Sequence, residues 1–295
     1  MNSFTSANEQ SSIVEALTSI RAASNIGRLL QDAGKLKPHD MERVLKLQQE
    51  QGLRFGEAAL RLGLVSEGDI QQALSEQFQY PYFPAAGANL SPELTTATDP
   101  YSKEAEVLRS VRSELLLRWF EEGHKVLAVS SARSDEGASY LAANLAVLFA
   151  QMGRKVLLVD ANLRQPRQHD IFHFGNGMGL SDILAERMAS LQVHTVKPFH
   201  TLAVLLAGSP PPNPVELLAR PAFDALLSGL ETSYDVILID TAPSQLSSDF
   251  QLVAARAGGV LIAARRNVSR LAQLGELKEK ITLTGAQVVG AVVLD

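Results

Sequence analysis

The chain has 295 residues, 46% apolar and 20% charged, which is enough to bury one large hydrophobic core or one large and one small core. Its formal net charge is −5 and it contains neither a basic run nor a basic amphipathic helix, so we expect no nucleic-acid binding and no direct membrane binding. The chain has no cysteine, which excludes disulfide frameworks and thiolate metal sites.

The N-terminal segment, MNSFTSANEQSS, is polar and lacks the basic-then-apolar order of a signal peptide. We expect residues 1–24 to form a disordered tail. No uninterrupted apolar stretch approaches the roughly 20 residues of a spanning helix. These features predict a cytoplasmic protein without direct membrane insertion, recruited to the inner membrane, if at all, by a partner.

Residues 25–83 are predicted to form a small all-α domain built from an internal repeat. Segments 27–48 and 56–77 share glycines at their first and eighth positions, apolar residues between them, and a terminal glutamine. Each copy has the pattern of a short helix, a glycine turn at Gly34 or Gly63, and a second amphipathic helix.

This repeat resembles the N-terminal domain of type II secretion and type IV pilus ATPases, whose tandem Arg-Leu-Gly and Gln motifs bind cyclic di-GMP in some members. The matching residues are Arg54, Gly56 and Gln77 in the second copy and Gly27 and Gln48 in the first. The first copy lacks the arginine, whose planar guanidinium suits a phosphodiester. The resemblance implies a cyclic di-GMP site, and the alternative is a helical adaptor that binds no nucleotide.

Residues 84–102 lack periodicity and contain three prolines, so they are predicted to be a linker to a domain spanning 103–295. That domain opens with a helix on which Glu106, Arg109 and Arg112 lie three residues apart. By spacing alone this triplet indicates a solvated helix flank with local ion pairs.

Lys125 to Ala150 has the pattern of a strand, a polar turn and a helix N-terminus. This is the layout of a phosphate-binding loop, in which backbone N–H groups and the helix dipole hold phosphate. The lysine position of the standard motif holds Ala138. The residues predicted to contact a nucleotide are Arg133, Ser134, Asp135, Glu136, Gly137, Ala138, Ser139 and Tyr140.

The apolar runs after this loop alternate with segments of helix length. This order predicts an α/β fold with a parallel sheet covered by helices on both faces. Two of the runs end in Asp160 and Asp240, and ligands of such sheets bind beyond the carboxyl ends of the strands. An acid at a strand end is either a metal ligand or a helix cap or salt-bridge partner.

Six segments together resemble the bacterial tyrosine kinases of capsule and exopolysaccharide systems, in particular the chain-length-determinant type. They are the Glu106 to Arg112 helix, the phosphate loop with SYLAANLA, LLVDANLRQPRQH, GLSDIL, AGSPPPNPVELL and VILIDTAP. The resemblance implies a P-loop NTPase-like fold, ATP with Mg²⁺, and tyrosine phosphorylation. It also implies a homo-oligomer and a membrane chain-length-determinant partner in a polysaccharide export complex.

The resemblance also implies roles for individual residues. Ser139 would bind magnesium through its hydroxyl, Asp240 would lie in the outer shell of the metal, and Asp160 would be the metal-linked acid or base, with Arg164 beside it. The residues Glu106, Arg109 and Arg112 would form a subunit contact.

The sequence departs from the family pattern at three positions of this site. Ala138 replaces the loop lysine, Asp135 replaces a glycine, and Asn162 replaces the second acid of Asp-x-Asp. Two functions remain open: a kinase with an altered cleft that regulates polysaccharide synthesis, and a catalytically inactive scaffold. We hypothesise that Arg133, a cation within the loop, partly compensates for the missing lysine.

Overall fold

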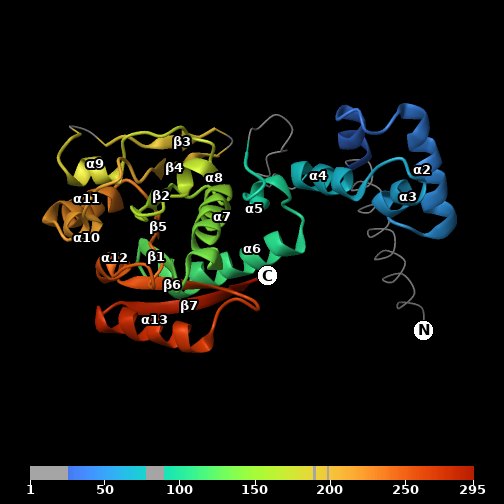
Figure 1. The fold of residues 1–295 in the computed structure, drawn as a ribbon. Coiled ribbons are helices and arrows are strands. Elements are labelled where there is room, and N and C mark those ends of the chain that lie inside the picture. The colour runs from blue at the N-terminus through green and yellow to red at the C-terminus, as the bar shows by residue number, and fades with distance from the viewer. Residues whose placement is uncertain (1–25, 78–89, 189–190, 198) are drawn as a thin grey trace, which may run out of the picture. The chain divides into compact units, whose positions relative to one another are not determined.

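The computed structural model describes residues 26–77, 90–188, 191–197 and 199–295. The chain forms two compact units, Met1–Tyr82 and Phe83–Asp295, whose elements are labelled in Figure 1. The tail predicted over residues 1–24 lies outside the described residues, as do residues 84–89 of the predicted linker.

The described residues of the smaller unit form two helix pairs. Residues 26–32 are followed by α2 (Pro38–Gln51), and α3 (Phe55–Arg61) is followed by α4 (Glu67–Gln77). The first helix of each pair ends near a left-handed glycine, Gly34 with φ 70° and Gly63 with φ 64°. Glycine adopts this conformation without steric cost, so the repeat in the sequence is also a repeat in the backbone.

The leading glycines of the two copies lie where helices approach closely. A Cβ on Gly27 would lie 2.8 Å from the terminal methyl of Met41, and one on Gly56 would lie 3.2 Å from a methyl of Ile70. Met41 and Ile70 occupy the same place in the two copies. Both glycines therefore have a packing role in the folded repeat.

Helix α4 begins with a reciprocal cap between Ser66 and Asp69. The Ser66 N–H donates to Asp69 Oδ2 at 2.9 Å, and the Asp69 N–H donates to Ser66 Oγ at 3.2 Å. Lys35 adds an ion pair at 3.0 Å. The hydrogen bonds from Ser66 lower the pKa of Asp69 to about 2. In the first copy Lys37 takes the place of Ser66, and its side chain makes no cap.

Asp69→Ala is expected to destabilise α4 by about 1 kcal/mol, because a helix-capping carboxylate is lost. The pKa of Asp69 is depressed in the folded state, so its contribution is present above the unfolded pKa and is lost as the pH falls toward about 2. Hydrogen-exchange protection of the α4 amides in the full chain measures the effect, with the exposed Glu50→Ala as control. Equal protection in the parent and Asp69→Ala at neutral pH would contradict this assignment.

The described residues of the larger unit form a seven-stranded sheet with the order β3-β4-β2-β5-β1-β6-β7. Neighbouring strands run parallel except for β3 and β4, which are antiparallel. The strands are β1 (Val126–Ser131), β2 (Val156–Asp160), β3 (His194–Val196), β4 (Phe199–Leu205), β5 (Val236–Asp240), β6 (Gly259–Arg265) and β7 (Gln287–Leu294). The sequence did not predict β3, which is short and contains no apolar run.

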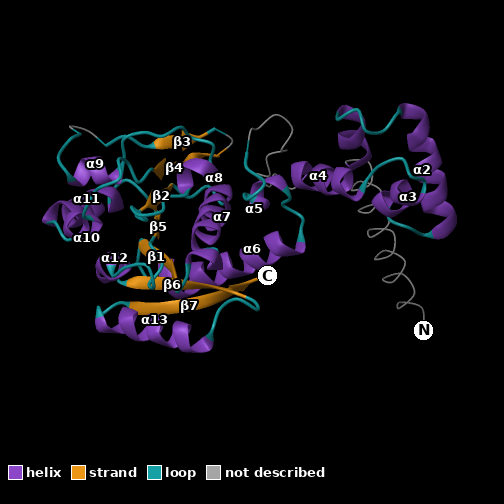
Figure 2. Ribbon diagram, viewed as in Figure 1, coloured by secondary structure: helices purple, strands orange, loops and turns teal. Residues whose placement is uncertain are grey.

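Helices cover both faces of this sheet (Figure 2), because alternate strand residues point to opposite sides. Leu127 and Val129 face a core that includes α6 and α7, whereas Val126 and Ala128 face a core that includes α9 to α13. The predicted α/β fold class is confirmed. The helices are α5 (Thr95–Thr98), α6 (Lys103–Leu115), α7 (Ala138–Gln151), α8 (Gln168–Ile171), α9 (Leu180–Leu184), α10 (Pro214–Leu218), α11 (Pro221–Glu231), α12 (Asp249–Ala257) and α13 (Leu271–Leu283).

Within the part of the chain that the structure describes, no helix combines the length and apolarity that crossing a bilayer requires.

Residues 90–102, which were predicted to be linker, pack against the larger unit. Asn144, buried in the middle of α7, accepts from the Thr96 N–H at 3.0 Å and donates to the Glu93 carbonyl at 2.8 Å. Leu94 and Ala97 are buried beside them. The segment is too short to show a helical period, so the sequence did not predict that it packs on the domain. Its contacts with α7 hold it there.

Asn144→Ala is expected to cost about 1–3 kcal/mol, since the Thr96 N–H and the Glu93 carbonyl lose a buried partner. Faster hydrogen exchange over residues 94–98 and a lower urea midpoint would record the loss. Ser113→Ala on the exposed side of α6 provides the control. Unchanged exchange in Asn144→Ala would show that the segment is held by other contacts.

Candidate functional site

The loop between β1 and α7 is shaped by the buried carboxylate of Glu136. Glu136 Oε2 accepts from the N–H groups of Ala132 and Arg133 at 2.8 and 2.9 Å, and Oε1 accepts from the Ser269 hydroxyl at 2.5 Å. The loop contains a 3-10 turn over Ser134–Glu136. These bonds fix the turn from within, so its curvature does not depend on a bound anion.

Gly137 joins this turn to α7 in a left-handed conformation with φ 85°. A Cβ at this position would lie 2.7 Å from a methyl of Leu294 on β7, so both the backbone and the packing require glycine. The first-turn N–H groups of α7 have no partner within the helix. The end of β1 therefore leads into a helix N-terminus that can bind an anion.

Two buried aspartates lie side by side at the carboxyl ends of β2 and β5. Asp160 and Asp240 are paired in the register of these strands, and both are fully buried. Asp160 Oδ2 accepts from the N–H groups of Arg167 and Gln168, each at 3.0 Å. Asp240 Oδ2 accepts from the Gln168 side-chain amide at 2.8 Å. Gln168 therefore binds both carboxylates.

Burial raises the pKa of Asp240 to about 6, although the hydrogen bond from Gln168 and the positive charge of Arg167 oppose the shift. Burial and the neighbouring charge of Asp240 raise the pKa of Asp160 well above its usual value. Two buried oxygens of this cluster, Asp240 Oδ1 and Gln168 Oε1, have no hydrogen-bond partner among the described residues. A pair of carboxylates with unpartnered buried oxygens can bind a cation or retain a proton.

A hollow of about 110 Å³ lies between the loop and these strand ends. It has room for a few water molecules or one phosphate group, and not for a whole nucleotide. It shares Ser134 and Pro243 with a larger hollow of about 400 Å³ that Arg133 and Asp135 also line. The residues around the smaller hollow are Ser131, Ser134, Ala138, Ser139, Asn162, Gln165, Arg167, Thr241 and Pro243.

The structure brings Ser134, Ala138 and Ser139 to the smaller hollow. Arg133 instead pairs with Asp135 at 3.0 Å beside the larger hollow. The Arg133 guanidinium lowers the pKa of Asp135. A loop sequence alone does not reveal this pair, because it depends on the path of the 3-10 turn.

Tyr140 and Arg164 are predicted site residues whose side chains bind other partners. The Tyr140 hydroxyl contacts Thr95 Oγ1 at 3.0 Å and donates to Glu104 at 2.9 Å, and burial raises its pKa to about 12. Arg164 binds the buried carboxylate of Asp249 at 2.6 Å. Only the backbone of Tyr140, in the first turn of α7, belongs to the loop, and Arg164 fastens the loop after β2 to α12.

The triplet on α6 makes contacts within the chain. Arg109 pairs with Glu106 at 2.7 Å and donates to the Pro100 carbonyl at 2.6 Å. Arg112 reaches the Leu148 carbonyl at 3.5 Å. The local ion pair expected from the spacing is present, and the predicted subunit contact stays a prediction.

The predicted cyclic di-GMP residues are spread over the helical repeat. Arg54 is exposed and its N–H donates to Glu57 at 3.1 Å, whereas Gly27 and Gly56 are buried. Gln48 lies on α2, and the side chain of Gln77 is outside the described residues. This ligand also stays a prediction.

Sequence reasoning did not single out Arg167 or Gln168. Both follow the strand-ending Asp160, Arg167 at the end of the loop and Gln168 at the start of α8, and the segments after such strands carry binding residues in parallel sheets. Neither Ser269 nor Asp249 gave a local signal, because each reaches the site from a distant part of the chain.

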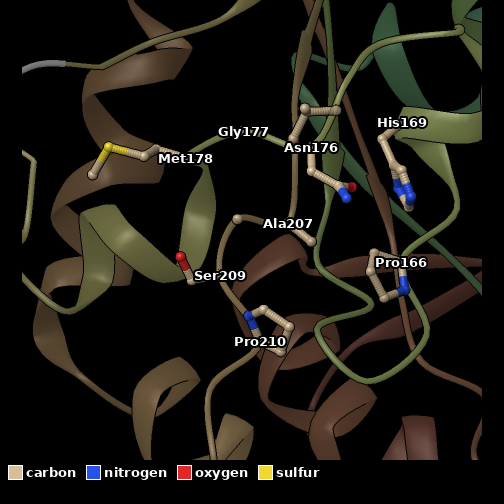
Figure 3. A pocket seen from close by; sticks show the side chains of 10 residues that line it. Pro166, His169, Asn176, Gly177, Met178, Ala207, Ser209 and Pro210 are labelled. Carbon is tan, nitrogen blue, oxygen red and sulfur yellow. The ribbon is translucent and has the colours of Figure 1, made fainter.

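A third hollow, of about 520 Å³, lies between the loop after β2 and the loop after β4 (Figure 3). Figure 3 shows His169, Asn176 and Ser209 around it, with Pro166 at its edge. The buried carboxylate of Asp182 accepts from the N–H groups of Gly179 and Ser209, both at 3.0 Å, and so joins GLSDIL to AGSPPPNP. Two segments of the predicted family pattern are therefore held together, and the second of them lines the hollow through residues 207–210.

No protein-family model matches the chain. Individual proteins do match it. Tyrosine-protein kinase YwqD of Bacillus subtilis is 32% identical over 206 residues, which cover 70% of this chain and 87% of the relative.

Solved structures also resemble this chain. The chimerical protein CapA2B2 is 30% identical with a TM-score of 0.65, and the match covers 77% of this chain and 98% of that one. The kinase domain of the Escherichia coli tyrosine kinase ETK is 28% identical with the same TM-score of 0.65, over 68% of this chain and 78% of that one. At this level of identity and coverage, the chain belongs to the bacterial tyrosine-protein kinase family.

Proposed function

We propose that the larger unit binds Mg²⁺ and ATP at the carboxyl edge of the sheet and transfers a phosphoryl group to tyrosine in the control of capsule or exopolysaccharide synthesis. The observation that carries this proposal is the pair Asp160 and Asp240, buried beside the Ser139 end of α7 with an unpartnered carboxylate oxygen. Membership of a tyrosine kinase family supplies the reaction class.

The residues present fit a magnesium ion. Oxygen atoms are the ligands that Mg²⁺ prefers, and it keeps several of its water molecules. Asp240 Oδ1 is a buried oxygen without a hydrogen-bond partner among the described residues, and Ser139 lines the adjacent smaller hollow. Ser139, Asp160 and Asp240 would hold the ion, which when bound neutralises charge on the transferred phosphate.

The chain's own groups supply positioning. The N–H groups at the start of α7 would bind the phosphate tail, and the smaller hollow would hold one phosphate group while the adjoining hollow holds more of the nucleotide. Asp160 is proposed as the acid or base toward the acceptor phenol, by the resemblance. Backbone N–H groups hold its carboxylate in a fixed direction.

The charge balance of the loop argues for a weakened enzyme. Ala138 supplies no ammonium, and Asp135 and Glu136 add carboxylates to the turn. Loss of one charge-assisted hydrogen bond weakens nucleotide binding by about 1.5–3 kcal/mol, and loss of a transition-state donor slows transfer by about 10²–10³. This observation favours a second candidate function, a kinase-like scaffold that binds nucleotide weakly or not at all.

We also propose that the chain assembles with copies of itself and with a membrane chain-length-determinant protein. The exposed side chains of Glu106 and Val107 on α6 support a subunit contact there, since 68% of the Glu106 side chain and 55% of Val107 face solvent. A cyclic dinucleotide at the helical repeat remains the finer proposal for the smaller unit, alongside an adaptor without a ligand.

Ala138→Lys is expected to tighten Mg·ATP binding by about tenfold or more, because it restores one charge-assisted hydrogen bond to phosphate. Calorimetric titration and phosphotyrosine formation measure binding and turnover. Ala138→Met, of similar length and no charge, is the matched control. If only Ala138→Lys gains ATP binding and phosphotyrosine formation, the parent is a disabled kinase. If the parent itself forms phosphotyrosine, it is an active kinase. If none of the parent, Ala138→Lys and Ala138→Met binds Mg·ATP, the proposal is contradicted.

Asp240→Asn is expected to stabilise the apoprotein above about pH 6 by roughly 1–3 kcal/mol, since it removes one of two like charges from a buried site. The raised pKa of Asp240 means that the parent loses stability as the pH rises from the unfolded value through about 6. Urea unfolding at acid and alkaline pH tests this, and an advantage that does not grow with pH would contradict it. The same variant is expected to lose magnesium-dependent ATP binding.

A further inference from the structure

We infer that Arg167 contacts the phosphates of the nucleotide and supplies the positive charge that Ala138 cannot. In the absence of nucleotide, the Glu93 carboxylate binds the Arg167 guanidinium, and an incoming phosphate replaces that carboxylate. This inference rests on the proposed nucleotide site. It names a binding residue that lies outside both the phosphate-loop motif and the pair of strand-ending aspartates.

The first support is the composition of the smaller hollow. Arg167 is the charged residue among the nine described residues that line it. Its backbone N–H donates to Asp160 Oδ2 at 3.0 Å, which fixes the backbone of this lining residue.

The second support is the partner of its side chain. Arg167 Nη2 donates to both carboxylate oxygens of Glu93, at 2.8 and 3.0 Å. The two side chains are 48% and 44% exposed, and an ion pair so open to water contributes little to stability. A phosphate group in the hollow would compete with this carboxylate, since guanidinium binds either anion through the same donors.

Glu93 is well placed for such an exchange because its backbone is fixed. Asn144 on α7 donates to the Glu93 carbonyl at 2.8 Å. The carboxylate can therefore leave the guanidinium by side-chain rotation without moving the chain.

Arg133 is the other candidate cation, and its surroundings differ. It lines the adjoining hollow, and both its Nε and Nη2 are bound by Asp135 two residues away at 3.0 and 3.1 Å. Both arginines pair with an exposed carboxylate, so what separates them is position: Arg167 lines the smaller, phosphate-sized hollow beside Ser139, and Arg133 does not. The geometry thus favours Arg167 over the loop arginine as the phosphate ligand.

The test compares Mg·ATP and magnesium tripolyphosphate binding by calorimetry in four variants of the full chain: Arg167→Ala, Arg133→Ala, Glu93→Gln and Arg118→Ala. Arg118 forms an exposed ion pair with Glu114 and is not among the residues that line either hollow, so it controls for loss of an arginine. We expect Arg167→Ala to weaken both ligands by about tenfold or more and Arg133→Ala by a smaller factor. We expect Glu93→Gln to tighten both by about two- to fivefold, because the competing carboxylate is gone.

The inference is overturned if Arg167→Ala binds as the parent does, or if Arg133→Ala loses more affinity than Arg167→Ala. It is also overturned if the parent binds neither ligand, because Arg167 then fails to replace the lysine. This outcome can be told apart from failure of the proposed function. If the parent binds neither ligand but Ala138→Lys binds them, the nucleotide site is real and only the role of Arg167 is wrong. Thermal unfolding of Arg167→Ala checks that the variant is folded.

Discussion

Two carboxylates on neighbouring parallel strands, buried in register with each other, impose the main constraint on the larger unit. Like charges in a poorly solvated place raise each other's pKa and must be balanced by donors or by a cation. The chain after β2 provides the donors: it folds back so that the N–H groups of residues 167 and 168 reach Asp160, and the Gln168 amide reaches Asp240. That return places the Arg167 side chain at the hollow.

The phosphate loop also contains a buried carboxylate, and here the carboxylate itself shapes the backbone. Its turn is fixed by the Glu136 carboxylate, which uses two backbone N–H groups and the Ser269 hydroxyl. The turn is thus preorganised and also acidic. With Ala138 the site has lost one positive charge relative to the family pattern, and with Asn162 it has lost one negative charge. These two replacements offset each other in net charge, but Asp135 in place of a glycine adds a negative charge, so the three departures together leave the site one charge more negative than the family pattern.

The helical repeat shows how one motif can have a packing explanation and a ligand explanation at the same residues. Gly27 and Gly56 are the glycines of the predicted dinucleotide motif, and both lie where a Cβ would press on the next helix. Their presence is explained by helix packing whether or not a ligand binds. Arg54, which is exposed, has no comparable packing role and so carries the ligand prediction for the second copy.

The sequence by itself determined the order of the apolar strands, the loop before α7, the two strand-ending aspartates, the helical repeat and the family. The strands, the loop, the aspartates and the repeat follow from local patterns that each segment carries without its neighbours, whereas the family follows from the resemblance of six segments in order. Only the tertiary structure decided that Arg164 binds Asp249, that Arg133 binds Asp135, that residues 90–102 pack on α7, and that Arg167 faces the hollow. The reason is physical: which charged groups meet depends on strand register and loop return, and partners such as Arg164 and Asp249 are 85 residues apart in the chain.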